Sequence, residues 1–200
     1  MNKKTILILF TMICIISLSA CNTTDEDQTK EKQQSNESVE TAGDMEEDTS
    51  QQIFVSLKDR KQQEVATATL TQEEDGVRIQ LSGQNFTPGK HGFHIHETGA
   101  CEGPDFSSAG GHFNPTNVSH GNVEDGPHAG DLPNVEVKED GTVQADTLAE
   151  MVTLEKGKPN SLLKEDGTAL VIHSDEDDYK SQPAGNAGER IACGVIQEGE

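Results

Sequence analysis

The stretch VRIQLSG, residues 77–83, alternates apolar and polar side chains. In an extended chain Val77, Ile79 and Leu81 fall on one face, and the polar residues between them fall on the other. This alternation is typical of a half-buried antiparallel strand. A Glu-Asp-Gly triplet precedes the stretch at residues 74–76, and Asp-Gly tolerates the positive φ of tight hairpin turns. The stretch therefore predicts one arm of a β-hairpin.

The same pattern extends over the rest of residues 51–200. Glu-Asp-Gly recurs at 139–141 and 165–167, beside further alternating or apolar stretches. The predicted strands are residues 53–58, 64–71, 77–82, 91–96, 134–138, 142–148, 168–173 and 192–196. No convincing long helical pattern follows residue 50. The expected fold class is all-β, an eight-stranded antiparallel β-barrel or sandwich.

Two long segments interrupt the regular spacing of the strands. Residues 97–133 and 174–191 are rich in glycine and weakly patterned. Loops of this length in a compact domain are usually functional or disordered. Both segments carry histidine or clustered acidic residues, so we interpret them as two long functional loops.

The first twenty residues have the pattern of an export signal. Lys3 and Lys4 precede an apolar run at residues 6–18, which is too short for a comfortable membrane span. The sequence LSAC at 18–21 resembles the lipobox of bacterial lipoproteins. That resemblance implies a signal peptide at residues 1–20, cleavage before Cys21, and a lipid such as palmitate on the protein. A plain secretory signal with an incidental cysteine is the alternative. We expect an extracytoplasmic protein anchored to the bacterial cell membrane through Cys21.

Residues 21–50 are expected to form an acidic, disordered tether. Residues 22–50 contain ten acidic residues, two lysines and almost no apolar side chains, so they cannot bury enough surface to offset their ordering entropy. The whole chain carries a formal charge of -21. Such a chain should repel nucleic acid, because phosphate binding needs clustered Lys and Arg. The folded domain is then residues 51–200.

Two cysteines remain in the folded domain once Cys14 has left with the signal peptide and Cys21 carries lipid. These are Cys101 and Cys193, and disulfides persist in exported proteins. A bridge between them would close a loop of about 90 residues, which the loop-entropy model values at roughly 4–5 kcal/mol.

Three histidines lie within HGFHIH, residues 91–96. On a strand His94 and His96 share a face, whereas His91 has the opposite parity. A His-x-His pair on a rigid strand can supply two ligands to one metal ion. Further candidate ligands are His112, His120, His128, Asp131 and His173. From the residue types, a zinc site with a carboxylate, a copper site of four imidazoles, and a single structural zinc with scattered surface histidines all remain open.

Five motifs carry a family resemblance. In chain order they are HGFHIHETG, CEGPDFSSAGGHFNP, HAGDLPNVEV, LVIHSDEDD and GNAGERIACGVI. Together they resemble the copper–zinc superoxide dismutases over about residues 51–200. The resemblance implies a Greek-key order for the strands. It also implies conversion of superoxide to O2 and H2O2 by alternate reduction and oxidation of a copper ion, which His112 bridges to a structural zinc.

The resemblance further implies roles for individual residues. The copper ligands would be His94, His96, His112 and His173. The zinc ligands would be His112, His120, His128 and Asp131. Asp177 would hydrogen-bond two of these histidines, His94 and His120. Arg190 would attract and orient superoxide, so that it and His112 are the catalytic residues. Cys101 and Cys193 match the disulfide of the family. His91 is left without a metal, and we expect it to pack and hydrogen-bond between a strand and a loop.

The sequence departs from some family members at Pro183 and Ala184, which replace a lysine and a threonine that line the substrate channel. Electrostatic attraction of superoxide would then depend on Arg190 and the copper. Two alternatives to an enzyme are a related domain that only binds zinc or buffers copper, and an adhesive β-sandwich lipoprotein with structural histidines. The sequence leaves both a homodimer and a monomer open.

Overall fold

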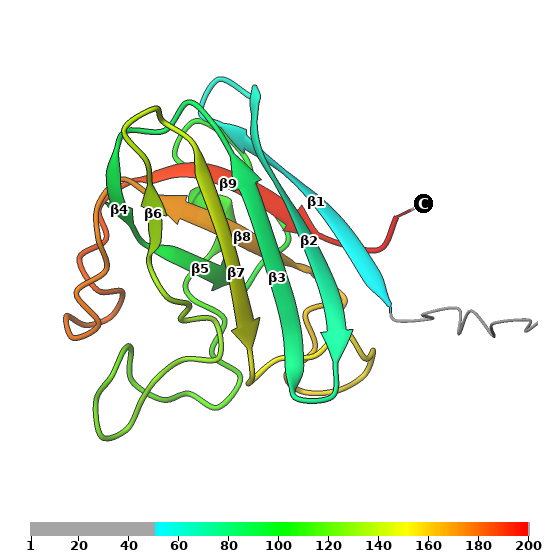
Figure 1. The fold of residues 1–200 in the computed structure, drawn as a ribbon. Coiled ribbons are helices and arrows are strands. Elements are labelled where there is room, and N and C mark those ends of the chain that lie inside the picture. The colour runs from blue at the N-terminus through cyan, green and yellow to red at the C-terminus, as the bar shows by residue number, and fades with distance from the viewer. Residues whose placement is uncertain (1–50, 200) are drawn as a thin grey trace, which may run out of the picture. The chain divides into compact units, whose positions relative to one another are not determined.

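The computed structural model describes residues 51–199, which contain nine strands and one short helix (Figure 1). The strands are β1 (Gln52–Asp59), β2 (Glu64–Glu73), β3 (Gly76–Gly83), β4 (Gly89–His91), β5 (Phe93–His96), β6 (Val135–Val137), β7 (Val143–Ala149), β8 (Thr168–His173) and β9 (Arg190–Ile196). The 3₁₀-helix η1 spans Ser107–Ala109. The predicted all-β fold class is confirmed.

The strands form one antiparallel sheet in the order β4-β6-β7-β3-β2-β1-β9-β8-β5. β1, β2 and β3 are consecutive hairpin neighbours, and β9 lies beside β1. β4, β6 and β7 are also neighbours, and β3, which precedes them in the chain, lies beside β7. This is the strand order of a Greek key. The sheet curls into a near-closed barrel, because its two outermost strands, β4 and β5, are separated in the chain by Gly92 alone.

The expected single strand at residues 91–96 is wrong in one respect, because it breaks at Gly92 into β4 and β5. The backbone N–H of Gly92 donates to Asp175 O at 2.8 Å, and Gly92 O accepts from the His173 N–H at 2.9 Å. A Cβ at Gly92 would lie 2.8 Å from the Cβ of Ala187, so only glycine fits. The break lets β4 pair with β6 and β5 pair with β8, which gives nine strands where eight were expected.

Alternating burial holds for β1 and β3 but not for β5 and β8. Every residue of β5 and β8 is buried. Their inward side chains, such as Ile95 and Leu170, join the main core. Their outward side chains are covered by the loops: Ala169 and Val171 of β8 pack with Phe106 in a second cluster. The loops therefore bury the outer face of β5 and β8 and exclude it from solvent.

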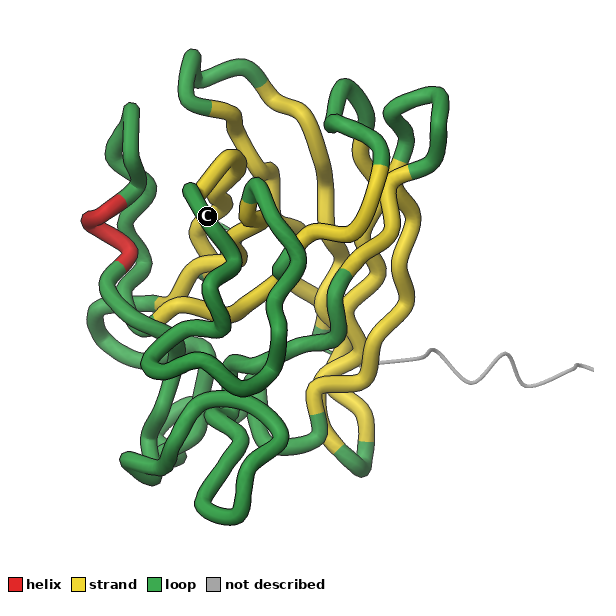
Figure 2. Tube along the Cα trace, turned by 90° about the vertical axis from the view of Figure 1, so that its left-hand side faces the viewer, coloured by secondary structure: helices red, strands yellow, loops and turns green. Residues whose placement is uncertain are grey.

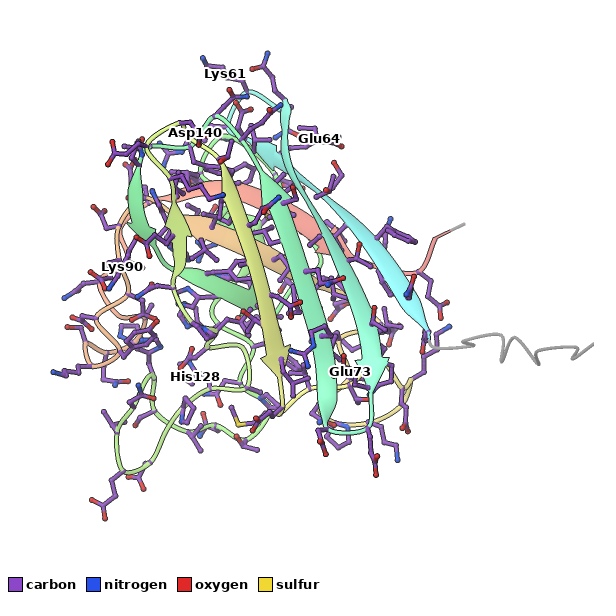
Figure 3. All side chains as sticks on the ribbon, viewed as in Figure 1. Lys61, Glu64, Glu73, Lys90, His128 and Asp140 are labelled. Carbon is purple, nitrogen blue, oxygen red and sulfur yellow. A yellow bond between two sulfur atoms is a disulfide. The ribbon has the colours of Figure 1, made fainter. Side chains whose placement is uncertain are left out.

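The loop between β5 and β6 also covers the free edge of β5. Ile95 N donates to Gly130 O at 2.9 Å, and Phe113 N donates to Ile95 O at 2.8 Å. A disulfide between Cys101 and Cys193 ties the start of this loop to β9, as expected. Figure 2 shows η1, in red, on the outer side of these loops. Figure 3 shows His128 of this loop toward the opposite end of the barrel from Lys61 and Asp140.

The predicted signal peptide, the predicted lipid site at Cys21 and the predicted acidic tether lie outside the described residues. Within residues 51–199, no helix is long and apolar enough to cross a membrane.

Candidate metal centre

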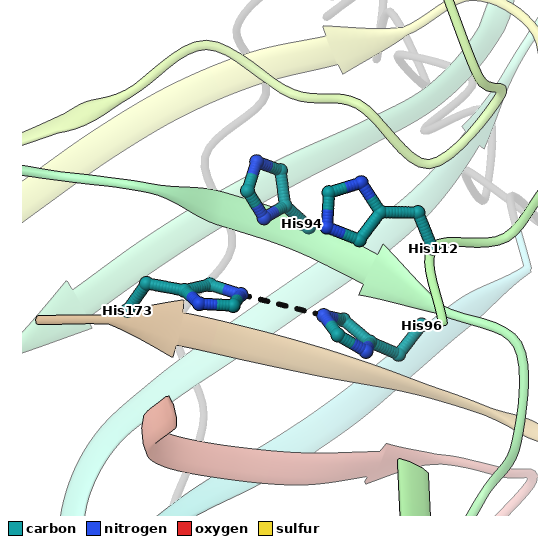
Figure 4. Close-up of side chains that lie close together, drawn as sticks. All are labelled: His94, His96, His112 and His173. Atoms are coloured by element: carbon teal, nitrogen blue, oxygen red, sulfur yellow. Dashed lines mark hydrogen bonds between the residues drawn. The ribbon is translucent and has the colours of Figure 1, made fainter. Parts of the chain in front are cut away.

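Four histidines converge on the outer face of β5 and β8 (Figure 4). His94 and His96 project from β5, and His173 ends β8, which pairs with β5. His112 reaches them from the loop, where its backbone forms an isolated bridge with His96. The imidazole rings of His94 and His112 have centroids 4.0 Å apart. The spacing of the pair HxH therefore places both side chains on the same face, as the sequence predicted.

The free ring nitrogens of these histidines fit a shared metal ion. His94 Nε2 lies 2.8 Å from Asp177 Oδ2, which leaves His94 Nδ1 buried without a hydrogen-bond partner. His96 Nδ1 contacts Gly110 O at 3.0 Å. The other ring nitrogen of His96, Nε2, faces His173 Nε2 at 3.4 Å. His112 Nε2 is also buried without a partner. Unpaired buried nitrogens are costly unless something binds them.

The spacing of the donor atoms supports the same interpretation. At metal–nitrogen distances of about 2.0–2.1 Å, any two ligands of one ion lie at most about 4.2 Å apart, and tetrahedral ligands about 3.3 Å apart. The four histidines each offer a nitrogen, and these nitrogens all lie within 4.8 Å of one another, so a small inward movement of the rings would bring all four within reach of one ion. Four imidazoles form a donor set suited to copper.

A second set of four ligands forms on the other side of His112. It consists of His112, His120, His128 and Asp131. Asp131 Oδ1 lies 2.8 Å from His112 Nδ1 and 3.2 Å from His128 Nδ1. His120 Nδ1 is 3.0 Å from Asp131 Oδ2, yet it makes no hydrogen bond, and a cation held by both atoms would explain that contact. Three imidazoles and one carboxylate are ligands of the type that zinc takes.

The Asp131 side chain is held in its negatively charged form, which favours binding of a cation. Burial opposes ionisation of its carboxyl, but hydrogen bonds from His112 and from the Gly121 N–H outweigh burial and hold the pKa of Asp131 well below its usual range. Its Oδ2 accepts from the backbone N–H of Gly121 at 2.8 Å and of His128 at 3.0 Å. The carboxylate is thus ionised and oriented toward the ligand set.

Asp177 links the two ligand sets through nitrogens that are not offered to either ion. Its Oδ2 contacts His94 Nε2 at 2.8 Å and its Oδ1 contacts His120 Nε2 at 3.1 Å. Burial acts to raise its pKa, but the hydrogen bonds from His94, the Tyr179 N–H and His120 lower it to about 2. Outer carboxylates of this kind fix the tautomer and the orientation of a ligating histidine.

Arg190 lies beside the histidine set at the start of β9. Its guanidinium donates to the backbone carbonyls of Phe106 and Gly110, the second at 2.6 Å. Burial lowers its pKa, and the charge of Asp105 partly offsets this. A cavity of about 580 Å³ opens here, and its wall includes His96, His112, His173, Arg190, Pro183 and Ala184. The structure thus brings the predicted arginine to the cavity that leads to the copper ligands.

His91 lies outside both ligand sets. Its ring nitrogens lie 2.7 Å from His173 O and 2.8 Å from Thr87 O. It therefore joins the end of β4 to the end of β8 and to the preceding loop. The strand break at Gly92 means that its position does not follow from strand parity, and its two carbonyl contacts account for it instead.

Sequence reasoning missed several residues that hold this centre together. Asn134 donates to Asp177 O at 2.9 Å and accepts from the Asp177 N–H at 3.0 Å. Tyr179 accepts a hydrogen bond from the Asn134 N–H at 2.6 Å through its hydroxyl. No spacing or composition pattern marks these residues, because their partners are backbone groups more than 40 residues away.

Acidification is expected to destabilise the metal-free protein between about pH 6.5 and pH 4. Burial lowers the pKa of His94 to about 4, of His96 to about 2 and of His173 to about 3. The unfolded chain takes up protons on these histidines near 6.5 and the folded chain does not, so the free energy of unfolding falls as pH falls through this window. From pH 7 to pH 5 we expect a loss of about 2 kcal/mol for each histidine. Urea unfolding at both pH values measures it; equal free energies would contradict the expectation.

Comparison with known proteins identifies the family. The family model described as copper/zinc superoxide dismutase matches residues 64–196. The chain belongs to the copper/zinc superoxide dismutase family. It is 53% identical over 143 residues to superoxide dismutase [Cu-Zn] 1 of Aquifex aeolicus, covering 70% of this chain and 85% of that one. It is 46% identical over 145 residues to a superoxide dismutase-like protein of Bacillus subtilis, covering 71% of this chain and 74% of that one.

Solved structures of copper/zinc superoxide dismutase relatives have the same fold. A double mutant of the SOD-like protein from Bacillus subtilis superimposes with a TM-score of 0.71 at 46% identity, covering 72% of this chain and 97% of that one. The Cu/Zn superoxide dismutase from Brucella abortus gives a TM-score of 0.61 at 29% identity, covering 73% of this chain and 99% of that one. The two ligand sets of this chain thus lie within a fold of that family.

Proposed function

We propose that the protein is a copper/zinc superoxide dismutase, an oxidoreductase that converts superoxide to O2 and H2O2. The observation that carries this function is the pair of four-residue ligand sets that share His112, one of four imidazoles and one of three imidazoles and a carboxylate. Bound copper would supply one-electron redox chemistry, and zinc, which has none, would fix the loop. Copper would be held by His94, His96, His112 and His173, and zinc by His112, His120, His128 and Asp131.

The residues of the chain divide the remaining work. His112 would be shared by both ions: its Nδ1 lies 2.8 Å from Asp131 Oδ1 of the zinc set, and its buried Nε2, which has no hydrogen-bond partner, is available to hold a proton for the substrate. Two adjacent dications make a doubly deprotonated imidazole reasonable when both sites are filled. Arg190 presents a cation to the cavity, where it attracts and orients the superoxide anion. Asp177 holds His94 and His120 in place.

A second candidate function is copper and zinc binding without turnover. The Bacillus subtilis relative named above is a SOD-like protein, and in its solved double mutant a tyrosine and a proline are each replaced by histidine. In this chain all six histidines and Asp131 of the two ligand sets are present and brought together. This favours the enzyme over a binding module.

Metal analysis combined with an activity assay separates the two functions. We expect the protein loaded with copper and zinc to bind about one equivalent of each and to remove superoxide catalytically. Protein loaded with zinc alone is the matched control and should be inactive, because zinc has no redox chemistry. Stoichiometric metal without turnover would support the binding module, and absence of both metals would contradict both functions.

We propose that the mature protein is a lipoprotein anchored to the outer side of the cytoplasmic membrane. The support is sequence alone: the basic start, the apolar run and the LSAC motif at residues 18–21. Residues 21–50 would then be an acidic tether and residues 51–200 the enzyme domain. The high negative charge gives no reason to expect a nucleic-acid partner.

Replacing Cys21 with serine is expected to prevent lipid attachment. Labelling with a palmitate analogue should mark the wild-type protein and not the Cys21→Ser variant, which should leave the membrane fraction. A Cys14→Ser variant is the control, because Cys14 lies within the predicted signal peptide, and it should label normally. Equal labelling of the Cys21→Ser variant and the wild type would disprove the lipoprotein proposal.

A further inference from the structure

Gln182 makes a two-point contact with the backbone of the zinc-set histidine His120. Gln182 Oε1 accepts from the His120 N–H at 2.9 Å, and Gln182 Nε2 donates to His120 O at 2.9 Å. A planar side-chain amide offers one acceptor and two donors, so it can satisfy both backbone groups of one residue as a neighbouring strand would. The contact joins the loop after β8 to the loop after β5, across 62 residues of chain.

His120 has no strand partner of its own. It lies in the loop between β5 and β6, and its ring is fully buried. Asp177 contacts the ring through Nε2, and this contact does not involve the backbone groups of His120. Gln182 fixes the main chain. The two contacts together determine where His120 Nδ1 points, which is toward Asp131.

The segment that carries Gln182 also packs closely against the hydrogen bond between Asp177 and His120. Gly185 has φ +71°, and a Cβ there would lie 1.8 Å from Asp177 Oδ1 and 2.7 Å from His120 Nε2. A residue with a side chain would therefore displace this hydrogen bond. Gln182, Pro183 and Ala184 also line the cavity beside Arg190. One short segment thus forms the cavity wall and holds a zinc ligand.

We infer that Gln182 is a positioning residue for zinc, and that it couples zinc retention to the wall of the substrate cavity. The inference rests on the proposed function only for the identity of the two ions. Loss of the Gln182 side chain should loosen the main chain of His120 and so lower the affinity for zinc. The copper set does not contain His120 and keeps its four ligands. By thermodynamic linkage, zinc bound at His120 should in turn hold residues 182–184 in place.

The test compares metal release from the copper- and zinc-loaded full-length protein into an excess of chelator. Gln182→Met keeps the length of the side chain and removes both hydrogen bonds, and we expect zinc release about tenfold faster, as for the loss of two modest hydrogen bonds. Gln182→Glu keeps the acceptor for the His120 N–H but sets a carboxylate against His120 O. We expect faster zinc release here too, although added negative charge alone would retain a cation longer. Copper release should stay within about twofold of wild type.

Lys180→Met is the matched control, because it changes an exposed side chain of the same segment and should leave zinc release unchanged. Three results would overturn the inference: zinc release within about twofold of wild type in Gln182→Met, slower zinc release in Gln182→Glu, or equal acceleration for both metals, which would indicate general loosening. The measurement uses no superoxide. Altered zinc release in a protein without dismutase activity would therefore support the inference and count against the proposed function.

Discussion

Replacing His112 with alanine is expected to reduce superoxide turnover at least about 100-fold. Loss of a residue that only orients a ligand already costs about 10- to 100-fold in metal affinity or activity, and His112 belongs to both ligand sets. Its removal takes one ligand from each ion and the nitrogen that can hold a proton. The measurement is the rate of superoxide removal per bound copper, together with the copper and zinc content of the purified protein.

His91→Ala is the matched control for this variant, since His91 is equally a buried histidine near β5 and β8. Its ring nitrogens lie against two carbonyl groups, His173 O and Thr87 O, of which a ring with one N–H can bond one, and it belongs to neither ligand set. We expect the variant to lower the free energy of unfolding by about 1–3 kcal/mol, because it removes a buried hydrogen-bonding side chain, and to retain copper. Loss of copper from a folded His91→Ala protein, or near-normal turnover in His112→Ala, would refute the assignment of the site.

Removing the disulfide is expected to lower the free energy of unfolding by roughly 4–5 kcal/mol. Cys101 and Cys193 are 92 residues apart in the chain, and the loop-entropy model assigns about this value to a loop of that length. The bond also fixes the segment that supplies the Phe106 and Gly110 carbonyls to Arg190. Turnover should therefore fall in the folded variant as well, since the guanidinium loses its support. Urea unfolding of Cys101→Ser, with the metals removed, gives the stability change.

The double variant Cys101→Ser with Cys193→Ser separates loss of the bond from effects of a lone thiol. It should be as unstable as each single variant, because the same cross-link is missing in all three. A change below about 1 kcal/mol in all of them would show that the denatured chain keeps this loop closed by other contacts, which the loop-entropy model does not allow for.

The strands were predictable where one face is buried and the other meets water. Val77, Ile79 and Leu81 follow this rule, and all three are buried in β3. It does not hold for β5 and β8, where the loops bury the outer face too. The break at Gly92 could not be foreseen, because its cause is a hydrogen bond to Asp175, which is remote in sequence.

The candidate site divides in the same way. The ligand histidines and Asp131 could be proposed from their residue types, their spacing and the family resemblance. Asn134, Gln182 and the Gly110 carbonyl could not, since amide and carbonyl groups occur throughout the chain and act here only through their position in space. The chemistry of a site is thus readable in its ionisable residues, whereas its support depends on the folded backbone.

The loop that carries the zinc ligands also shields β5, one of the two outermost strands of the sheet. Open strand edges are templates for pairing with another chain, and proteins commonly protect them by covering them. Here the cover is held by the ligands themselves, since Gly130 and Phe113, which bond to the edge at Ile95, flank Asp131 and His112. Protein depleted of zinc would therefore have a greater tendency to aggregate through this edge, so the metal would protect solubility as well as activity.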